Sequence, residues 1–157
     1  MKPLHGRRNF LTALAMAPAM PWALAAAATL PAAVSLPDEL KQALSAKLPL
    51  LVMVSLEGCP FCRVARESYL IPMRERQSFV VVQVDMRSKQ MLRNLQGEMQ
   101  SHDEWIRSMN VKVAPTVLFF GRGGTEIAER MTGGYIPDFY GAYLDDRIRQ
   151  AKATLAN

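Results

Sequence analysis

Cysteine and histidine are both scarce in this sequence, with two residues of each among 157. A framework of structural disulfides is excluded, because two cysteines form at most one bridge. A closed zinc site is disfavoured, since it needs four ligands and the chain adds only His5 and His102 to the two sulfurs. We expect His102 to be a surface residue rather than a catalytic base.

The signatures of several other functions are also absent. The sequence contains no phosphate-cradling loop, no dinucleotide fingerprint and no spacing typical of a Ser-His-Asp triad. Its 19 basic and 14 acidic residues are interspersed, which is typical of a solvated surface rather than of a nucleic-acid-binding stripe. We therefore expect no nucleic-acid partner.

The apolar stretch closest to membrane-span length lies at the N-terminus. Lys2 and the pair Arg7-Arg8 precede an alanine-rich segment that runs to about Ala28. This pattern predicts a secretory signal over residues 1–28, and the paired arginines followed by Phe-Leu resemble a twin-arginine export signal. The segment is short, poor in Leu and Ile and interrupted by two prolines, so cleavage between Ala25 and Ala28 is favoured over an uncleaved anchor.

Removal of this segment changes the character of the chain. The net charge falls from +5 to +2, because three basic residues and no acids leave with it. Residues 29–37, rich in Ala and Pro, are predicted to be a mobile linker. Residues 38–157 suit one domain with one core, and we expect a periplasmic monomer. Disulfides persist in that compartment.

The two cysteines stand together as Cys59-Pro60-Phe61-Cys62, between the apolar run Leu50–Leu56 and a predicted helix. A thiolate at the start of a helix is stabilised by unpaired N–H groups and by the macrodipole, which lowers the thiol pKa. The second sulfur, one turn later, is placed to resolve a mixed disulfide. A structural disulfide would gain little from closing so short a loop. We predict thiol–disulfide exchange, with Cys59 as nucleophile and Cys62 as resolving residue.

The hydrophobic pattern predicts an α/β fold. Strands separated by helices imply parallel crossovers, and a final hairpin adds an antiparallel edge. Residues 87–100 stay open between a helix and a strand-like excursion that turns at Gln96-Gly97. The expected elements are helix 38–47, strand 50–56, a helix from Cys59 that Pro72 kinks or ends near Ile71, strand 79–84, a capping-box helix 101–109, strand 116–120, strand 125–131 and a helix from Pro137 with Phe139, Tyr143, Ile148 and Leu155 on one side.

This element order, with Cys-x-x-Cys opening a helix after the first core strand and Ala114-Pro115-Thr116 before the third, resembles the thioredoxin superfamily over the whole mature chain. The resemblance implies a central mixed sheet flanked by helices on both faces. It also implies a cis Ala114–Pro115 bond beside the dithiol, where Ala114 and Pro115 position a substrate chain in extended pairing. No cofactor is expected beyond the redox-active disulfide.

A narrower resemblance is to exported thioredoxin-like proteins of the SoxW type, which are associated with bacterial sulfur oxidation. It rests on the twin-arginine-like signal, on the excursion around Leu95-Gln96-Gly97 and on the segment Gly134–Phe139. The implied partners are a disulfide-containing protein or small sulfur compound as substrate and a membrane transporter of reducing equivalents as electron donor.

Two departures from the family pattern stand out. Many thioredoxin-like proteins carry a buried carboxylate six residues before the first cysteine, and Met53 occupies that position here. Proton transfer would then rely on water or on Glu57, which we expect at the rim. The pair Pro60-Phe61 is more similar to glutaredoxins than to strongly reducing thioredoxins, which predicts an intermediate potential.

The expected function is reduction of protein or small-molecule disulfides. Three alternatives stay open. The same chemistry in reverse gives a disulfide donor, two thiolates assisted by Met53 or Met131 give a Cu(I) metallochaperone, and a degenerate redox site gives an interaction module. Phe61 and Tyr135 are candidates for an apolar contact rim.

Overall fold

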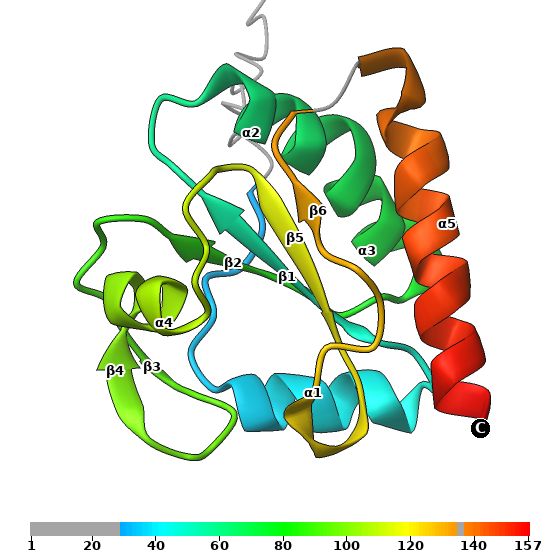
Figure 1. The fold of residues 1–157 in the computed structure, drawn as a ribbon, viewed down its shortest axis with the longest axis horizontal. Coiled ribbons are helices and arrows are strands. Elements are labelled where there is room, and N and C mark those ends of the chain that lie inside the picture. Colours follow the sequence, from blue (N-terminus) through cyan, green and yellow to red (C-terminus); the bar gives the residue numbers. More distant parts are fainter. Residues whose placement is uncertain (1–28, 135–136) are drawn as a thin grey trace, which may run out of the picture.

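The computed structural model of the protein describes residues 29–134 and 137–157 (Figure 1). The predicted signal over 1–28 and Tyr135 lie outside these residues. The elements in chain order are α1 (Leu36–Ser45), β1 (Leu50–Ser55), α2 (Pro60–Val64), a π-helical segment (Ala65–Leu70), α3 (Ile71–Gln77), β2 (Val81–Asp85), β3 (Met91–Arg93), β4 (Met99–Ser101), α4 (His102–Ser108), β5 (Thr116–Phe120), a 3-10 turn (Arg122–Gly124), β6 (Met131–Thr132) and α5 (Pro137–Ala156).

Strand β1 lies inside a four-stranded sheet of order β2-β1-β5-β6, and all six of its residues are buried. Such a near-continuous apolar strand needs cover on both faces. Helices α2, α3 and α5 cover one face, while α1 and α4 cover the other (Figure 1). Leu51 and Met53 face the first layer, and Val52 and Val54 face the second. The predicted mixed sheet with helices on both faces is confirmed.

The direction of β5 differs from the prediction. Strand β2 is parallel to β1, with Leu51 opposite Val81, but β5 is antiparallel to it, with Val54 opposite Thr116. The seven-residue helix α4 spans only about 10 Å, too little to carry the chain back along the sheet. The chain therefore re-enters the sheet at the end where β2 leaves it, and Thr116 comes to lie beside the end of β1.

Pro72 was predicted to kink or end the helix near Ile71, and the second alternative was wrong, because the helix after the cysteines continues past Pro72 to Gln77. The reason is the π-helical segment before the proline, where the Ile71 N–H reaches the Arg66 carbonyl, five residues back. This wider turn places Pro72 in the first turn of α3, where a missing N–H is tolerated. The helix instead ends at Ser78, which has a left-handed φ of 58°.

Residues 29–37 do not form the predicted mobile linker. Leu30, Ala33 and Leu36 are buried, and α1 begins at Leu36 rather than at Asp38. The Ala33 N–H donates to the Gln83 carbonyl at 2.8 Å, and the Gln83 N–H donates to the Pro31 carbonyl at 2.8 Å. The small and apolar side chains of this segment therefore pack as an extra edge on β2, and the domain begins by Leu30.

His102 is fully buried, which corrects its predicted surface position. The predicted capping box is present, with Ser101 and Glu104 bonding each other's backbone N–H groups. The His102 Nδ1 atom accepts from the Asp85 N–H at 3.2 Å, so Nε2 carries the proton and donates to the Ala33 carbonyl at 3.0 Å. The ring thus ties the 30–36 segment to β2 as a structural residue.

The remaining predictions concern hairpins and the last helix. Residues 87–100, for which the sequence allowed a helix or a strand-like excursion, contribute to the β3–β4 hairpin, with Gly97 at a φ of 90°. The predicted strand 125–131 is reduced to β6 and an isolated bridge between Phe120 and Glu126. In α5, Phe139 and Tyr143 are exposed, contrary to prediction. The inward stripe consists of Tyr140, Leu144, Ile148, Ala151 and Leu155. No helix within 29–134 and 137–157 is long and apolar enough to span a membrane.

The carboxyl of Glu39 at the start of α1 gives a pH-dependent prediction. Its Oε1 accepts the Val34 N–H at 3.0 Å and the Ser35 N–H at 3.4 Å, while Oε2 is buried with no partner among the described residues. Burial raises the pKa of Glu39 above its ordinary 4.5, against the lowering effect of these N–H groups. The folded state therefore binds this proton more tightly than the unfolded state. The resulting stabilisation is present at low pH and is lost as the pH rises through the folded pKa.

We predict that Glu39→Gln raises the unfolding free energy at pH 7 relative to that at pH 4, compared with the same difference in the wild type, because it removes a stabilisation that is lost as the pH rises. Urea unfolding at each pH measures this difference. Glu75→Gln, at an exposed position on α3, separates this effect from simple loss of a charge. An unchanged pH dependence in Glu39→Gln would contradict the assignment.

Candidate redox site

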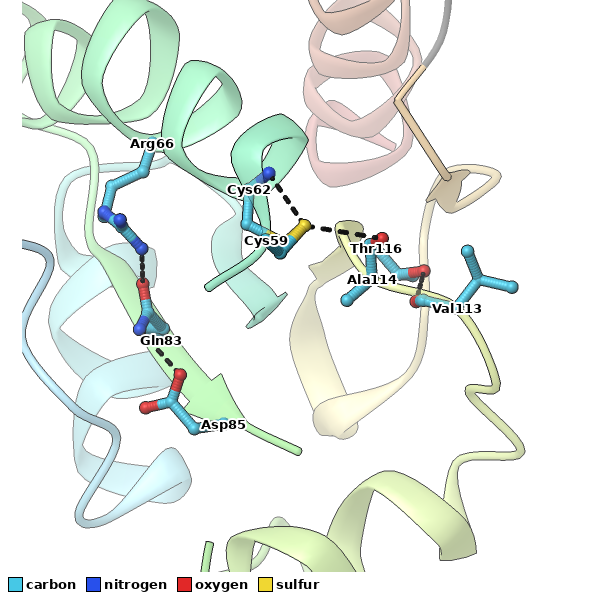
Figure 2. Close-up of a disulfide and its surroundings, with 8 residues drawn as sticks. All are labelled: Cys59, Cys62, Arg66, Gln83, Asp85, Val113, Ala114 and Thr116. Atoms are coloured by element: carbon cyan, nitrogen blue, oxygen red, sulfur yellow. Dashed lines mark hydrogen bonds between the residues drawn. A yellow bond between two sulfur atoms is a disulfide. The ribbon is translucent and has the colours of Figure 1, made fainter. Parts of the chain in front are cut away.

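The two cysteines lie at the junction between β1 and α2, and they form a disulfide with a Cα–Cα distance of 5.3 Å (Figure 2). Gly58, at a φ of 74°, allows the tight turn that leaves β1. Cys59 is the N-cap of α2, and its Sγ accepts the Cys62 N–H at 3.1 Å. Cys59 is half-buried, whereas Cys62 is 1% exposed. The first sulfur is therefore the one that a partner reaches.

The Ala114–Pro115 peptide bond is cis, as the resemblance implied. The Ala114 carbonyl oxygen lies 3.9 Å from the Cys59 Sγ. The Thr116 hydroxyl donates to the Val113 carbonyl at 2.7 Å, which fixes the loop just before β5 (Figure 2). Ala114 is half-buried and Pro115 is buried. The structure thus brings the second predicted motif against the first.

The position six residues before Cys59, where many thioredoxin-like proteins carry a buried carboxylate, is apolar in this protein. Met53 is fully buried and belongs to the same core cluster as Cys62. Glu57, the other candidate for proton transfer, is exposed and lines a cleft that also includes Cys59. Its role in proton transfer stays a prediction, because no hydrogen bond joins it to either sulfur among the described residues.

A polar chain beside the cysteines was not found from the sequence. Arg66 Nη1 donates to Gln83 Oε1 at 3.2 Å, and Gln83 Nε2 donates to Asp85 Oδ1 at 2.8 Å (Figure 2). These residues line the same cleft, whose volume is about 1080 Å³. The available signals were the position of Arg66 four residues after Cys62, on the same side of the helix, and the one amide inside the apolar strand β2.

The apolar rim is only partly described. Phe61 is 55% exposed and Val113 is 46% exposed, while Tyr135 lies outside the described residues. Phe61 packs against Gly134, because a Cβ built there would lie 2.7 Å from Phe61 Cδ1. Phe61 lies within the Cys-x-x-Cys motif, and Val113 directly precedes Ala114-Pro115.

No group of three or more metal-ligating His, Cys, Asp or Glu residues occurs in the part of the chain that the structure describes. Met53 and Met131, the predicted auxiliary sulfur ligands, are both buried in the core cluster that contains Cys62.

Comparison with known proteins places the chain in a family. A family model described as a thioredoxin-like domain matches residues 36–148, and the chain belongs to that family. No curated protein matches. Among solved structures, one described as a DsbH oxidoreductase is 18% identical over 90% of this chain and 95% of that one, with a TM-score of 0.51. A thioredoxin from Thermus thermophilus is 22% identical over 78% and 87%, with a TM-score of 0.49. Thioredoxin O2 from Arabidopsis thaliana, in the oxidised state, is 17% identical over 73% and 93%, also with 0.49.

The likeness to the DsbH oxidoreductase structure, at 18% identity, shows the fold alone. Family membership together with a Cys-x-x-Cys pair at disulfide distance supports an enzyme of the thiol–disulfide oxidoreductase class.

The contact between Gly134 and Phe61 gives a second prediction. A Cβ at residue 134 would meet Phe61 Cδ1 at 2.7 Å and both Cβ and Cγ at 2.8 Å, so the start of α2 must shift to make room. We expect Gly134→Ala to lower the unfolding free energy of the oxidised protein by about 1–2 kcal/mol, measured by urea unfolding. Phe61→Ala removes two of the three crowding atoms and should reduce the cost of Gly134→Ala in a double-mutant cycle. Additive effects would contradict this packing.

Proposed function

We propose that the protein is a periplasmic thiol:disulfide reductase in which Cys59 attacks the substrate and Cys62 resolves the intermediate. The observation that carries this proposal is the asymmetry of the two sulfurs. Cys59 is half-buried at a helix start, with the Cys62 N–H on its Sγ at 3.1 Å, and Cys62 is 1% exposed behind it. A sulfur that receives an N–H bond is stabilised as a thiolate, which is the attacking species.

The reaction proceeds in two exchanges. The Cys59 thiolate attacks one sulfur of the substrate disulfide, forming a mixed disulfide and releasing the other half as a thiolate. Cys62, as a thiolate, then attacks the Cys59 sulfur, which restores the Cys59–Cys62 disulfide and releases the second half. Two electrons pass from the dithiol to the substrate, and the two thiol protons end on the released halves or in solvent.

The substrate chain is positioned by the loop before β5. The Ala114 carbonyl lies 3.9 Å from the Cys59 sulfur and is followed by the buried cis Pro115. A backbone in this position pairs with an extended chain as an added strand, which holds the scissile disulfide at Cys59.

Deprotonation of Cys62 depends on water or on Glu57. Met53 supplies no proton acceptor, and none of the fully buried residues in the described part of the chain is a carboxylate. Glu57 shares the cleft with Cys59 and can exchange protons through solvent. We propose that this step is slower than in relatives with the buried carboxylate.

The reducing direction, the compartment and the donor rest on the SoxW-type resemblance and on the signal pattern over residues 1–28. We propose export through a twin-arginine-type signal with subsequent cleavage, a monomeric mature domain, and regeneration of the dithiol by a membrane transporter of reducing equivalents. Sulfur oxidation is the proposed setting.

Cu(I) transfer by the same two thiols is a second candidate. The observation in its favour is that Met53 and Met131 belong to the same core cluster as Cys62, which puts soft sulfur ligands on the same side of the sheet as the dithiol. Tight stoichiometric Cu(I) binding by the reduced protein, without reduction of disulfides, would support this candidate over reductase activity.

The order of attack gives a third prediction. In Cys62→Ala, Cys59 attacks a partner disulfide but no second sulfur resolves the product. We expect covalent complexes from cell-envelope extracts on non-reducing gels, and their loss on addition of dithiothreitol. The double variant Cys59→Ala, Cys62→Ala is the matched control and should yield none. An absence of complexes with the single variant would count against the mechanism.

The direction of exchange gives a fourth prediction. A reductase with the Pro60-Phe61 pair should have a midpoint potential of roughly −200 to −270 mV, between disulfide isomerases and thioredoxin. The measurement is equilibration in glutathione redox buffers followed by alkylation of free thiols. A midpoint near about −120 mV would instead identify a disulfide donor.

A further inference from the structure

A cleft of about 1080 Å³ opens beside Cys59, away from the substrate-pairing loop. Figure 2 shows the chain formed by Arg66, Gln83 and Asp85 on one side of the cysteines and Ala114 on the other. The cleft lining includes Cys59 but neither Ala114 nor Pro115. A ligand in this cleft would therefore lie beside Cys59 without occupying the position of an extended protein chain.

Three arginines from two parts of the chain line this cleft. Arg63 lies in α2, Arg66 lies in the π-helical segment that follows it, and Arg87 lies in the turn after β2. The acidic side chains in the lining are Glu57 and Asp85. Cations therefore outnumber carboxylates around Cys59.

Within residues 29–134 and 137–157, the three arginines form no ion pair. The ion pairs within the described residues involve Arg107, Arg130, Arg147 and Arg149, and none involves a cleft arginine. Gln83 separates Arg66 from Asp85, because it accepts from the first and donates to the second. The positive charge of the cleft is thus available to a ligand.

Arg66 is the cleft arginine whose guanidinium has a buried nitrogen without a hydrogen-bond partner among the described residues. It is half-buried, its only side-chain hydrogen bond among the described residues is the one from Nη1 to Gln83, and its Nε is buried without a partner there. Removing a guanidinium from water without a counter-ion costs free energy, and a bound carboxylate that pairs with the guanidinium offsets this cost.

We propose that the cleft binds a small-molecule disulfide that carries carboxylates, with Arg63, Arg66 and Arg87 as positioning residues while Cys59 attacks its disulfide bond. This inference rests on the proposed function and names the substrate class for the same site. Concave sites of comparable volume hold small molecules, whereas protein chains pair along the Ala114 loop. Cys59 bonds to one half of the ligand, the other half leaves as an anionic thiolate, and Cys62 completes the exchange as described above.

The test compares disulfides that differ in charge. The reduced full-length protein is mixed with oxidised glutathione (anionic), hydroxyethyl disulfide (neutral) or cystamine (cationic), and oxidation is followed by acid quench and alkylation. Each rate constant is divided by that of dithiothreitol with the same disulfide, which removes intrinsic reactivity. We expect the normalised rates to fall in the order anionic, neutral, cationic. The preference should shrink as salt is added.

Charge removal should reduce the anionic-to-neutral ratio. We expect about a threefold fall for Arg87→Gln and roughly a tenfold fall for the triple Gln variant at Arg63, Arg66 and Arg87. The ratio cancels any change in thiolate reactivity, since that change affects all disulfides alike. Because Arg66 is half-buried, the double variant Arg63→Gln, Arg87→Gln at two exposed positions provides the test if the triple variant does not fold.

Arg74→Gln is the matched control, because Arg74 is exposed on α3 and does not line the cleft. It should keep the wild-type ratio. An unchanged ratio in the cleft variants, or equal normalised rates for all three disulfides in the wild type, would overturn this inference and leave the proposed function intact. If none of the three disulfides oxidises the protein, the proposed function itself fails.

Discussion

The contact from the Cys62 N–H to the Cys59 sulfur is the interaction on which the site depends. It makes a cysteine serve as a helix cap, a position where an acceptor satisfies one of the unpaired N–H groups of the first turn. The same contact fixes which sulfur points outward and which is buried. Because the helix begins directly after a fully buried strand, the reactive sulfur is held by the core itself rather than by a mobile loop.

The second half of the site is supplied by the antiparallel pairing of β1 and β5. Val54 lies opposite Thr116, so the residues just before Thr116 are delivered to the end of β1 where the cysteines stand. The excursion through β3, β4 and α4 returns to that end of the sheet, and His102 anchors it to Asp85 and Ala33. Packing far from the sulfurs therefore positions the Ala114 carbonyl beside Cys59.

The sequence allowed the dithiol, the capping box and most strands to be predicted, because each depends on neighbouring residues or on a regular apolar pattern. The cis Ala114–Pro115 bond was implied by the family resemblance. The errors concern tertiary contacts. The direction of β5, the burial of His102 and the packing of residues 30–36 depend on segments far apart in the chain. The helix through Pro72 required a π-helical turn that no local pattern indicates. The cleft escaped prediction because its arginines are drawn from separate elements.

The cleft and the departure at Met53 concern the same part of the molecule. Met53 lies opposite Gln83 in the sheet, and Gln83 holds Arg66. Many thioredoxin-like proteins place a negative charge at the position of Met53, whereas Met53 is apolar. The polar side chain opposite it in the sheet, Gln83, is hydrogen-bonded to the positively charged Arg66. Opposite charges attract more strongly where water is partly excluded. A positive charge in place of a negative one therefore favours anions beside the dithiol, both as incoming ligands and as departing thiolates. The same replacement removes a built-in acceptor for the Cys62 proton.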